Sequence, residues 1–155
     1  MIITVGISDM KFSQNKDDEI VTHALGSCVG IAIYDQQQGV GGLFHYMLPD
    51  TTDEKNSPLM CASTGIPLFL NEFESLGGRA NRSKIKAAGG STINTEKDVL
   101  QIGKRNVLAL KKILWKFNLL LEGEDFGGTT YRTMKLVMAN GKVICKNHQQ
   151  GEWEI

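Results

Sequence analysis

Short apolar stretches separated by turn residues dominate this chain, and most of them have the composition of strands rather than helices. Runs of β-branched and aromatic residues, or strict polar–apolar alternation, indicate strands, and clusters of glycine, asparagine and aspartate indicate turns. The predicted strands are 2–5, 10–13, 19–22, 29–34, 40–48, 83–88, 119–121, 131–139 and 142–146. Asn140-Gly141, between the last two, is a strong hairpin signal.

Two longer segments have helical periodicity. The first, 58–76, begins at Ser57-Pro58, which suits an N-cap followed by a first-turn proline, but Pro67 predicts a kink or a late start to its regular part. The second, 103–117, has an apolar stripe opposite lysines that are most simply a solvated face. Strands outnumber helices and do not alternate with them regularly. The pattern therefore predicts an α/β protein with largely antiparallel or mixed sheets, not a doubly wound fold.

The predicted hairpin over 29–48 carries the most informative pair of side chains. Gly26-Ser27-Cys28 places a thiol at the start of its first strand, and His45 lies on the returning strand. A two-residue loop at Gln36-Gln37 would put Cys28 directly opposite His45, with Cβ atoms about 4.5–5.5 Å apart. A three-residue loop ending at Gly39 would oppose Cys28 to Tyr46 instead, with His45 facing the other way. The sequence leaves both registers open.

Each candidate residue also has an ordinary structural explanation. Free cysteine is among the residues most often buried, and a lone histidine is more often a core residue than a catalyst. Cys61 lies in the apolar stripe of the first helix without a nearby base, so we expect it in the core. His23 competes with His45 as a base, but as the neighbour of Thr22 on a strand it should point to the opposite face.

Composition narrows the class of protein. At 155 residues the chain predicts one domain over 1–155, and 17 basic against 17 acidic residues give no preference for nucleic acid or an anionic membrane. No apolar run approaches the roughly 20 residues of a membrane span, and the N-terminus does not resemble a signal peptide. Three widely spaced cysteines suggest neither a disulfide framework nor a zinc site. A reducing, cytoplasmic location fits best.

The central segment resembles the CheD family, the chemoreceptor glutamine deamidases of bacterial chemotaxis. That family has a Thr…Gly-Ser-Cys…His arrangement, with the cysteine six residues after the threonine and the histidine seventeen after the cysteine. Thr22, Cys28 and His45 match both spacings, and the segment 45–49 is similar to the family's sequence around its histidine. Three later segments extend the resemblance over nearly the whole chain: 86–90, 102–107, and 124–128 followed by Arg132.

The resemblance implies a layered α/β/β sandwich like that of other cysteine deamidases. It also implies hydrolysis of glutamine side-chain amides to glutamate through a thioester, without metal or organic cofactor. Cys28 would be the nucleophile, held as a thiolate by an ion pair with His45, and Thr22 would orient the imidazole through its hydroxyl or its carbonyl. Backbone N–H groups of the Gly26-Ser27-Cys28 segment would bind the oxyanion or the substrate.

The implied partners are methyl-accepting chemotaxis receptors as substrates and a CheC-type chemotaxis phosphatase. Two other functions stay open at this point. One is another cysteine hydrolase, such as a peptidase or a transglutaminase-like enzyme. The other is a binding module that regulates the phosphatase without turnover.

Overall fold

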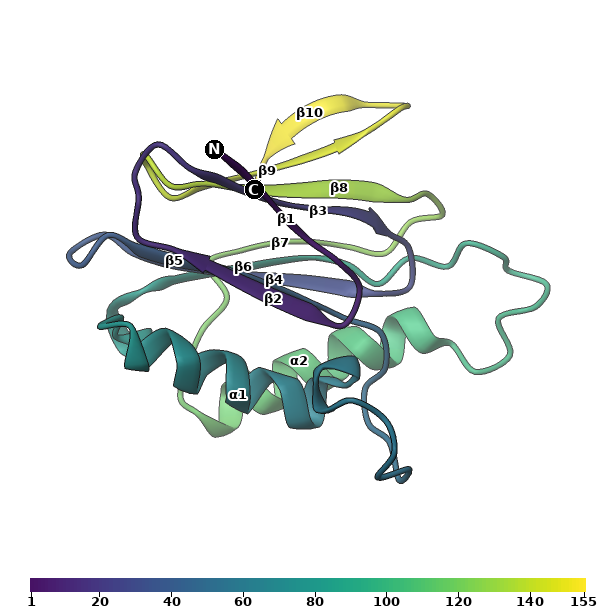
Figure 1. Ribbon diagram of the computed structural model, residues 1–155. Coiled ribbons are helices and arrows are strands. Elements are labelled where there is room, and N and C mark those ends of the chain that lie inside the picture. Colours follow the sequence, from purple (N-terminus) through teal and green to yellow (C-terminus); the bar gives the residue numbers. More distant parts are fainter.

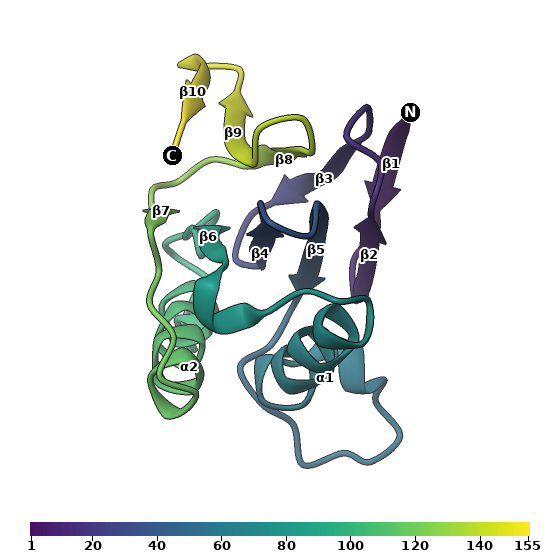
Figure 2. The same ribbon diagram turned by 90° about the vertical axis from the view of Figure 1, so that its left-hand side faces the viewer.

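The computed structural model describes residues 1–155 and has three layers: a helical layer, a middle sheet and an outer sheet (Figures 1 and 2). The outer sheet has the strand order β1 (Ile2–Val5), β3 (Glu19–Leu25), β8 (Arg132–Val137), β9 (Lys142–Asn147) and β10 (Gly151–Glu154). The middle sheet has the order β2 (Asp9–Ser13), β5 (Val40–Tyr46), β4 (Val29–Asp35), β6 (Lys84–Gly89) and β7 (Gly123–Phe126). The helices α1 (Ala62–Ser75) and α2 (Ile102–Lys116) cover the free face of the middle sheet. Only the β1–β3 and β6–β7 pairs are parallel, so the predicted α/β/β sandwich with largely antiparallel strands is confirmed.

The middle sheet is buried on both faces, and this explains its composition. All seven residues of β4 are buried. Ile31 and Ile33 pack toward the helices with Phe44, whereas Ala32 and Leu43 belong to the core between the sheets. A strand covered on both sides carries a continuous apolar run rather than an alternating one, as the sequence of β4 does.

The α1 region starts in two steps, in agreement with the late start that Pro67 predicts. A 3₁₀ turn at Pro58–Met60 begins with the Ser57 hydroxyl accepting the Leu59 N–H, and the regular helix starts only at Ala62. Pro67 lies in the second turn of α1, and Phe69 and Phe73 on its buried face pack against the middle sheet. Neither helix combines the length and the apolar character that a membrane crossing requires.

One strand prediction is wrong, and one strand was missed. Residues 119–121 form no strand; the chain there leaves α2, and the strand that follows is β7, two residues further on. β10 was not predicted at all. Both β7 and β10 are four-residue strands with mainly polar sequences, and a strand this short at the edge of a sheet leaves no apolar alternation to detect.

Candidate active site

The β4–β5 hairpin has neither of the two predicted registers. Gly30 pairs with His45, and Asp35 pairs with Val40, so the turn contains four residues rather than two or three. The buried Asp35 carboxylate explains the longer turn, because it accepts hydrogen bonds from the N–H groups of Gln37 (2.9 Å) and Gln38 (3.2 Å) inside it. Cys28 is therefore not opposite His45 but two positions further along the neighbouring strand.

The pairing still places Cys28 and His45 on the same side of the middle sheet. Gly30 and its cross-strand partner His45 face the outer sheet, and Cys28, just before the strand, lies on the same side. Cys28 accordingly packs against the core between the sheets. Gly30 has no side chain to separate the two residues, and a Cβ there would meet Met134 Sδ at 2.9 Å. The Met134, Leu25 and Thr22 side chains of the outer sheet thus fill the space over Gly30.

Thr22 of β3, on the opposite sheet, holds the His45 ring. Its hydroxyl donates to the Val5 carbonyl (2.8 Å) and lies 2.7 Å from His45 Nδ1. Because the hydroxyl has one proton and gives it to Val5, the ring must donate its Nδ1–H to the hydroxyl oxygen. This assigns the free lone pair to Nε2, which is buried and has no hydrogen-bond partner. The resulting tautomer is the one a general base needs.

Burial determines the protonation states of the pair. His45 is fully buried, and burial lowers its pKa from 6.5 to about 4. Burial also raises the pKa of the Cys28 thiol above its ordinary value, against a smaller opposite effect of the residue's own backbone N–H. At neutral pH the resting site therefore holds a neutral thiol and a neutral imidazole. Burial thus favours the neutral pair over the thiolate–imidazolium pair that the family resemblance implies.

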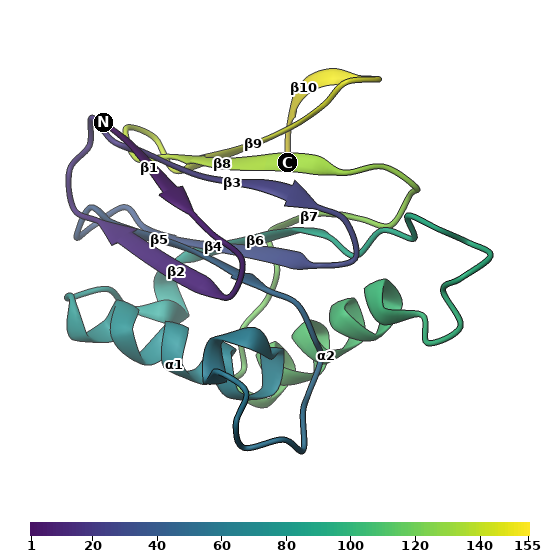
Figure 3. The same ribbon diagram turned by 45° about the vertical axis from the view of Figure 1, so that its right-hand side comes forward.

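Cys28 lines a cleft of about 450 Å³ at one end of the sandwich. Gly26 and Ser27 line the cleft together with the thiol. Its apolar wall is formed by Ile7, Ile93, Ile102 and Tyr131. The loop 92–101 projects beside the β3–β4 connection at this end (Figures 1 and 3). The N–H groups of Ser27 and Cys28 donate to no other residue of the chain, which leaves them available as oxyanion donors.

The backbone before Cys28 is tied to the end of β6. The Gly90 N–H donates to the Cys28 carbonyl (2.9 Å) and the Ser91 N–H donates to the Gly26 carbonyl (2.8 Å). Gly89 has φ +120° at this point, and a Cβ on it would lie 2.2 Å from the Cys28 carbonyl oxygen. The sequence alone favours a plain turn at Gly89-Gly90, but the structure shows a close approach of this backbone to the nucleophile segment.

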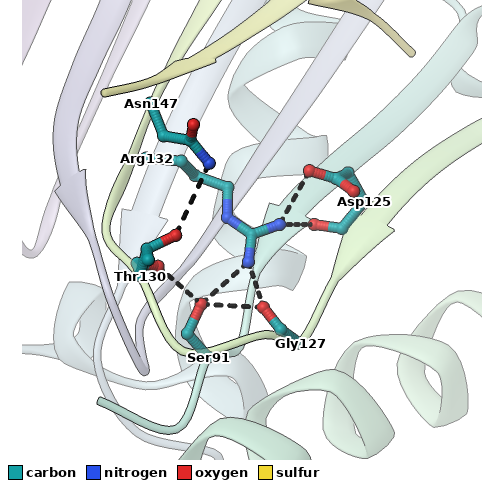
Figure 4. A network of polar contacts seen from close by, with 6 residues as sticks. All are labelled: Ser91, Asp125, Gly127, Thr130, Arg132 and Asn147. Carbon is teal, nitrogen blue, oxygen red and sulfur yellow. Dashed lines mark hydrogen bonds and ion pairs between the residues drawn. The ribbon is translucent and has the colours of Figure 1, made fainter. Parts of the chain in front are cut away.

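A buried arginine fixes the wall behind this segment (Figure 4). The Arg132 guanidinium of β8 forms an ion pair with Asp125 of β7 (2.8 Å) and donates to the Ser91 hydroxyl (2.8 Å) and to the Gly127 carbonyl. The Ser91 hydroxyl lies 2.9 Å from the Gly127 carbonyl and 3.0 Å from the Thr130 carbonyl. Because Arg132 belongs to the outer sheet and Asp125 to the middle sheet, the network joins the two sheets at the edge of the cleft.

The other histidine and cysteine candidates lie away from the cleft. His23 is exposed on the outer face of the outer sheet, where it contacts Thr133, so its predicted orientation opposite Thr22 is confirmed. Cys61 and Cys145 are fully buried, and burial raises the pKa of both thiols, that of Cys145 to about 12. No group of three or more His, Cys, Asp or Glu side chains is close enough to hold a metal ion.

Sequence reasoning missed Asn106 of α2. Its Nδ2 donates to the carbonyls of Ser27 and Met47, each at 2.8 Å. The signal was present, because Asn106 falls on the helix face that also buries Leu110 and Leu114. A polar residue in an apolar stripe that is buried needs hydrogen-bond partners, and here they lie far away in the sequence.

Several known proteins are similar to this chain. The family model for CheD chemotactic sensory transduction matches residues 47–147. The chain belongs to the CheD family. A relative from Syntrophus aciditrophicus, "Probable chemoreceptor glutamine deamidase CheD 1", is 43% identical over 149 residues, which cover 94% of this chain and 93% of the relative. A second, from Solibacter usitatus, is named "Probable chemoreceptor glutamine deamidase CheD" and is 41% identical over 155 residues, covering 97% of this chain and 92% of the relative.

The family membership confirms the resemblance inferred from the Thr…Cys…His spacing. The matched family segment starts after Thr22, Cys28 and His45, but the alignments with the CheD relatives extend over nearly the whole chain. Among solved structures, protein NMB0706 of Neisseria meningitidis, from the family DUF152, is similar with a TM-score of 0.44 and 10% identity. The match covers 83% of this chain and 63% of that structure.

Proposed function

We propose that this protein is a chemoreceptor glutamine deamidase, in which the whole chain 1–155 forms one catalytic domain. The observation that carries the proposal is the orientation of His45, whose Nδ1–H is held by Thr22 while Nε2 is left free on the face that carries Cys28. This arrangement supports a nucleophile, its base and a residue that orients the base. The names of the CheD relatives supply the substrate class, glutamine side chains of chemoreceptors.

The first half of the proposed reaction forms a thioester and releases ammonia. His45 Nε2 takes the thiol proton as the Cys28 sulfur attacks the side-chain carbonyl carbon of glutamine. The backbone N–H groups of Cys28 and Ser27 are the proposed donors to the oxyanion, and Gly26 lets Tyr131 and Ile93 of the cleft wall lie close against this segment. The imidazolium then gives its proton to the amide nitrogen, the C–N bond breaks, and ammonia leaves.

The second half hydrolyses the thioester. Neutral His45 takes a proton from water as the oxygen attacks the thioester carbon, and the C–S bond breaks to release glutamate. The proton returns to Cys28, so the resting thiol and imidazole are restored. Since burial favours the neutral forms of both residues, proton transfer accompanies the attack on the amide rather than preceding it.

Intact-mass analysis of a receptor cytoplasmic fragment tests this function directly, because each amide-to-acid conversion adds about 1 Da. Incubation with the wild-type protein should increase the mass of the receptor fragment and release ammonia. Cys28→Ala and His45→Ala should each lower the rate by about 10³-fold or more. His23→Ala is the matched control on the outer face and should retain the wild-type rate. A Cys28→Ala protein that is active within a few-fold of wild type would refute the assignment of the nucleophile.

The proposal also includes a binding partner and a cellular compartment. We propose a CheC-type chemotaxis phosphatase as a binding partner and the cytoplasm as the compartment. Three unpaired cysteines support a reducing location. If the partner covers the cleft, alkylation of Cys28 should weaken its binding; if it uses another surface, binding should survive. Binding without any ammonia release from receptors would instead favour the regulatory module.

A further inference from the structure

Asn106 occupies a position where the packing alone would suit leucine. It is fully buried on the face of α2 that also carries Leu110 and Leu114, one and two turns further along. Its Oδ1 is buried without a hydrogen-bond partner. Burying an amide that is only partly satisfied is unfavourable, so the contacts of its other side-chain atom must compensate.

The Nδ2 group of Asn106 connects the two segments that carry the proposed catalytic pair. It donates 2.8 Å hydrogen bonds to the carbonyl of Ser27, the residue before Cys28, and to the carbonyl of Met47, two residues after His45. Neither carbonyl accepts a backbone N–H in the turns and loops of the chain. One side chain therefore joins the entrance of β4 to the exit of β5, just beyond the last pair of their ladder.

A second contact fixes Asn106 itself to β5. The Tyr46 hydroxyl, from the residue next to His45, donates to the main-chain carbonyl of Asn106 (2.8 Å). The first turns of α2 are thus attached both to the nucleophile segment and to the strand that carries the base. Asn106 does not line the cleft, so it has no direct contact with a substrate placed there.

We propose that Asn106 is a positioning residue that sets the distance and direction between the Cys28 sulfur and His45 Nε2. The inference rests on the proposed function and deepens it. Cys28 lies outside the β4 ladder, and its diagonal relation to His45 is not fixed by strand pairing alone. Without the Asn106 bonds, the 26–28 segment would be held to the end of β5 only indirectly, through β4 and through the Gly90 and Ser91 N–H bonds at the end of β6. Misplacement of a reacting group by about 1 Å can cost about 100-fold in rate.

Asn106→Leu is the sharpest variant, because leucine has nearly the same size and suits the neighbouring residues but donates no hydrogen bond. It should lower kcat for receptor deamidation by about 10- to 100-fold with KM changed less than about threefold. Leu110→Ala is the matched control on the same buried face. It creates a cavity and lowers the unfolding temperature, yet it should keep kcat within about twofold. Asn106→Ser, whose hydroxyl can donate one bond, is the second variant if Asn106→Leu does not fold.

A double-mutant cycle on Cys28 alkylation tests the same inference without any receptor. In the wild-type background His45→Ala should slow the reaction of Cys28 with iodoacetamide, because the base that takes the thiol proton is gone. In the Asn106→Leu background the same change should have little further effect, because the segment that carries Cys28 is no longer bonded to the end of the strand that carries His45. A full His45→Ala effect in that background, or an unchanged kcat, would overturn the proposal. A wild-type protein that releases no ammonia from receptors would refute the proposed function while the alkylation cycle still decides the role of Asn106.

Discussion

At the scale of single residues, one threonine hydroxyl determines which ring nitrogen of His45 can act. The hydroxyl gives its only proton to the Val5 carbonyl and can therefore only accept from Nδ1–H. Many catalytic histidines are oriented by a carboxylate, which would also favour the charged ring. A neutral hydroxyl orients the ring without favouring its charge, in keeping with the low pKa that burial gives His45.

Replacing Thr22 tests this role. Thr22→Val keeps the shape but removes the acceptor, so the buried Nδ1–H loses its partner and the ring can turn. We expect kcat for deamidation to fall about 10- to 100-fold, less than the 10²–10⁴-fold typical for loss of the general base itself. Thr22→Ser keeps the hydroxyl and is the matched control, which should stay within a few-fold of wild type. Equal activity in the Val and Ser variants would show that the hydroxyl does not orient His45.

The buried imidazole also makes the stability of the protein dependent on pH. The pKa of His45 is about 4 in the folded protein against 6.5 as its ordinary value, so between these values only the unfolded chain binds the proton. The stabilisation is therefore complete above pH 6.5 and is lost as the pH falls toward 4. At ~1.4 kcal/mol per pH unit, the loss is on the order of 3 kcal/mol.

Urea unfolding between pH 4 and pH 7 measures this loss. The glutamine side chain of His45→Gln does not titrate, so the free energy of unfolding of this variant should change less with pH over the same range. His23→Gln is the control on the outer face and should keep the wild-type slope. An identical slope in wild type and His45→Gln would mean that the ring is protonated, or exposed to water, in the folded state.

At the scale of elements, local patterns predicted most of the framework of the site. The segments of β3, β4, β5 and β6 were recognisable from β-branched and apolar residues, and the spacing of Thr22, Cys28 and His45 identified the candidate side chains. The register of the hairpin was not predictable in the same way. It depends on the Asp35 carboxylate, which binds its own turn and also Arg82 (2.9 Å), 47 residues away.

The contacts that hold the site in place come from residues distant in the sequence. Asn106 bonds to the Ser27 carbonyl across 79 residues, and Arg132 bonds to Ser91 across 41. Periodicity can mark Asn106 as an unusual buried polar residue, but the identity of its partner depends on how α2 packs against the sheet. Elements could thus be predicted one by one, whereas the hydrogen bonds between them required the assembled fold.

At the scale of the whole molecule, the sandwich places the reacting atoms at the boundary between dry and wet regions. His45 and Thr22 lie inside the layer between the two sheets and are fully buried, whereas Cys28 is half-buried where that layer opens into the cleft. Because water is excluded from the layer between the sheets, the proton affinity of the base stays low and its orientation stays constant. A thiol at the mouth of the layer can still meet a side chain that projects from a large protein substrate.

The same layering predicts how the three cysteines react. Cys61 and Cys145 are fully buried, so in the native protein iodoacetamide should modify Cys28 alone, and all three should react once the protein is unfolded. Because burial raises the pKa of Cys28 above its ordinary value of 9.0, the native rate should keep rising as the pH passes 9. Mass-resolved alkylation from pH 6 to pH 10 measures both effects, and Cys28→Ala is the control that should leave the native protein unmodified. A rate that levels off below pH 7 would instead indicate a preformed thiolate–imidazolium pair, and equal labelling of Cys145 would mean that the two sheets separate readily in solution.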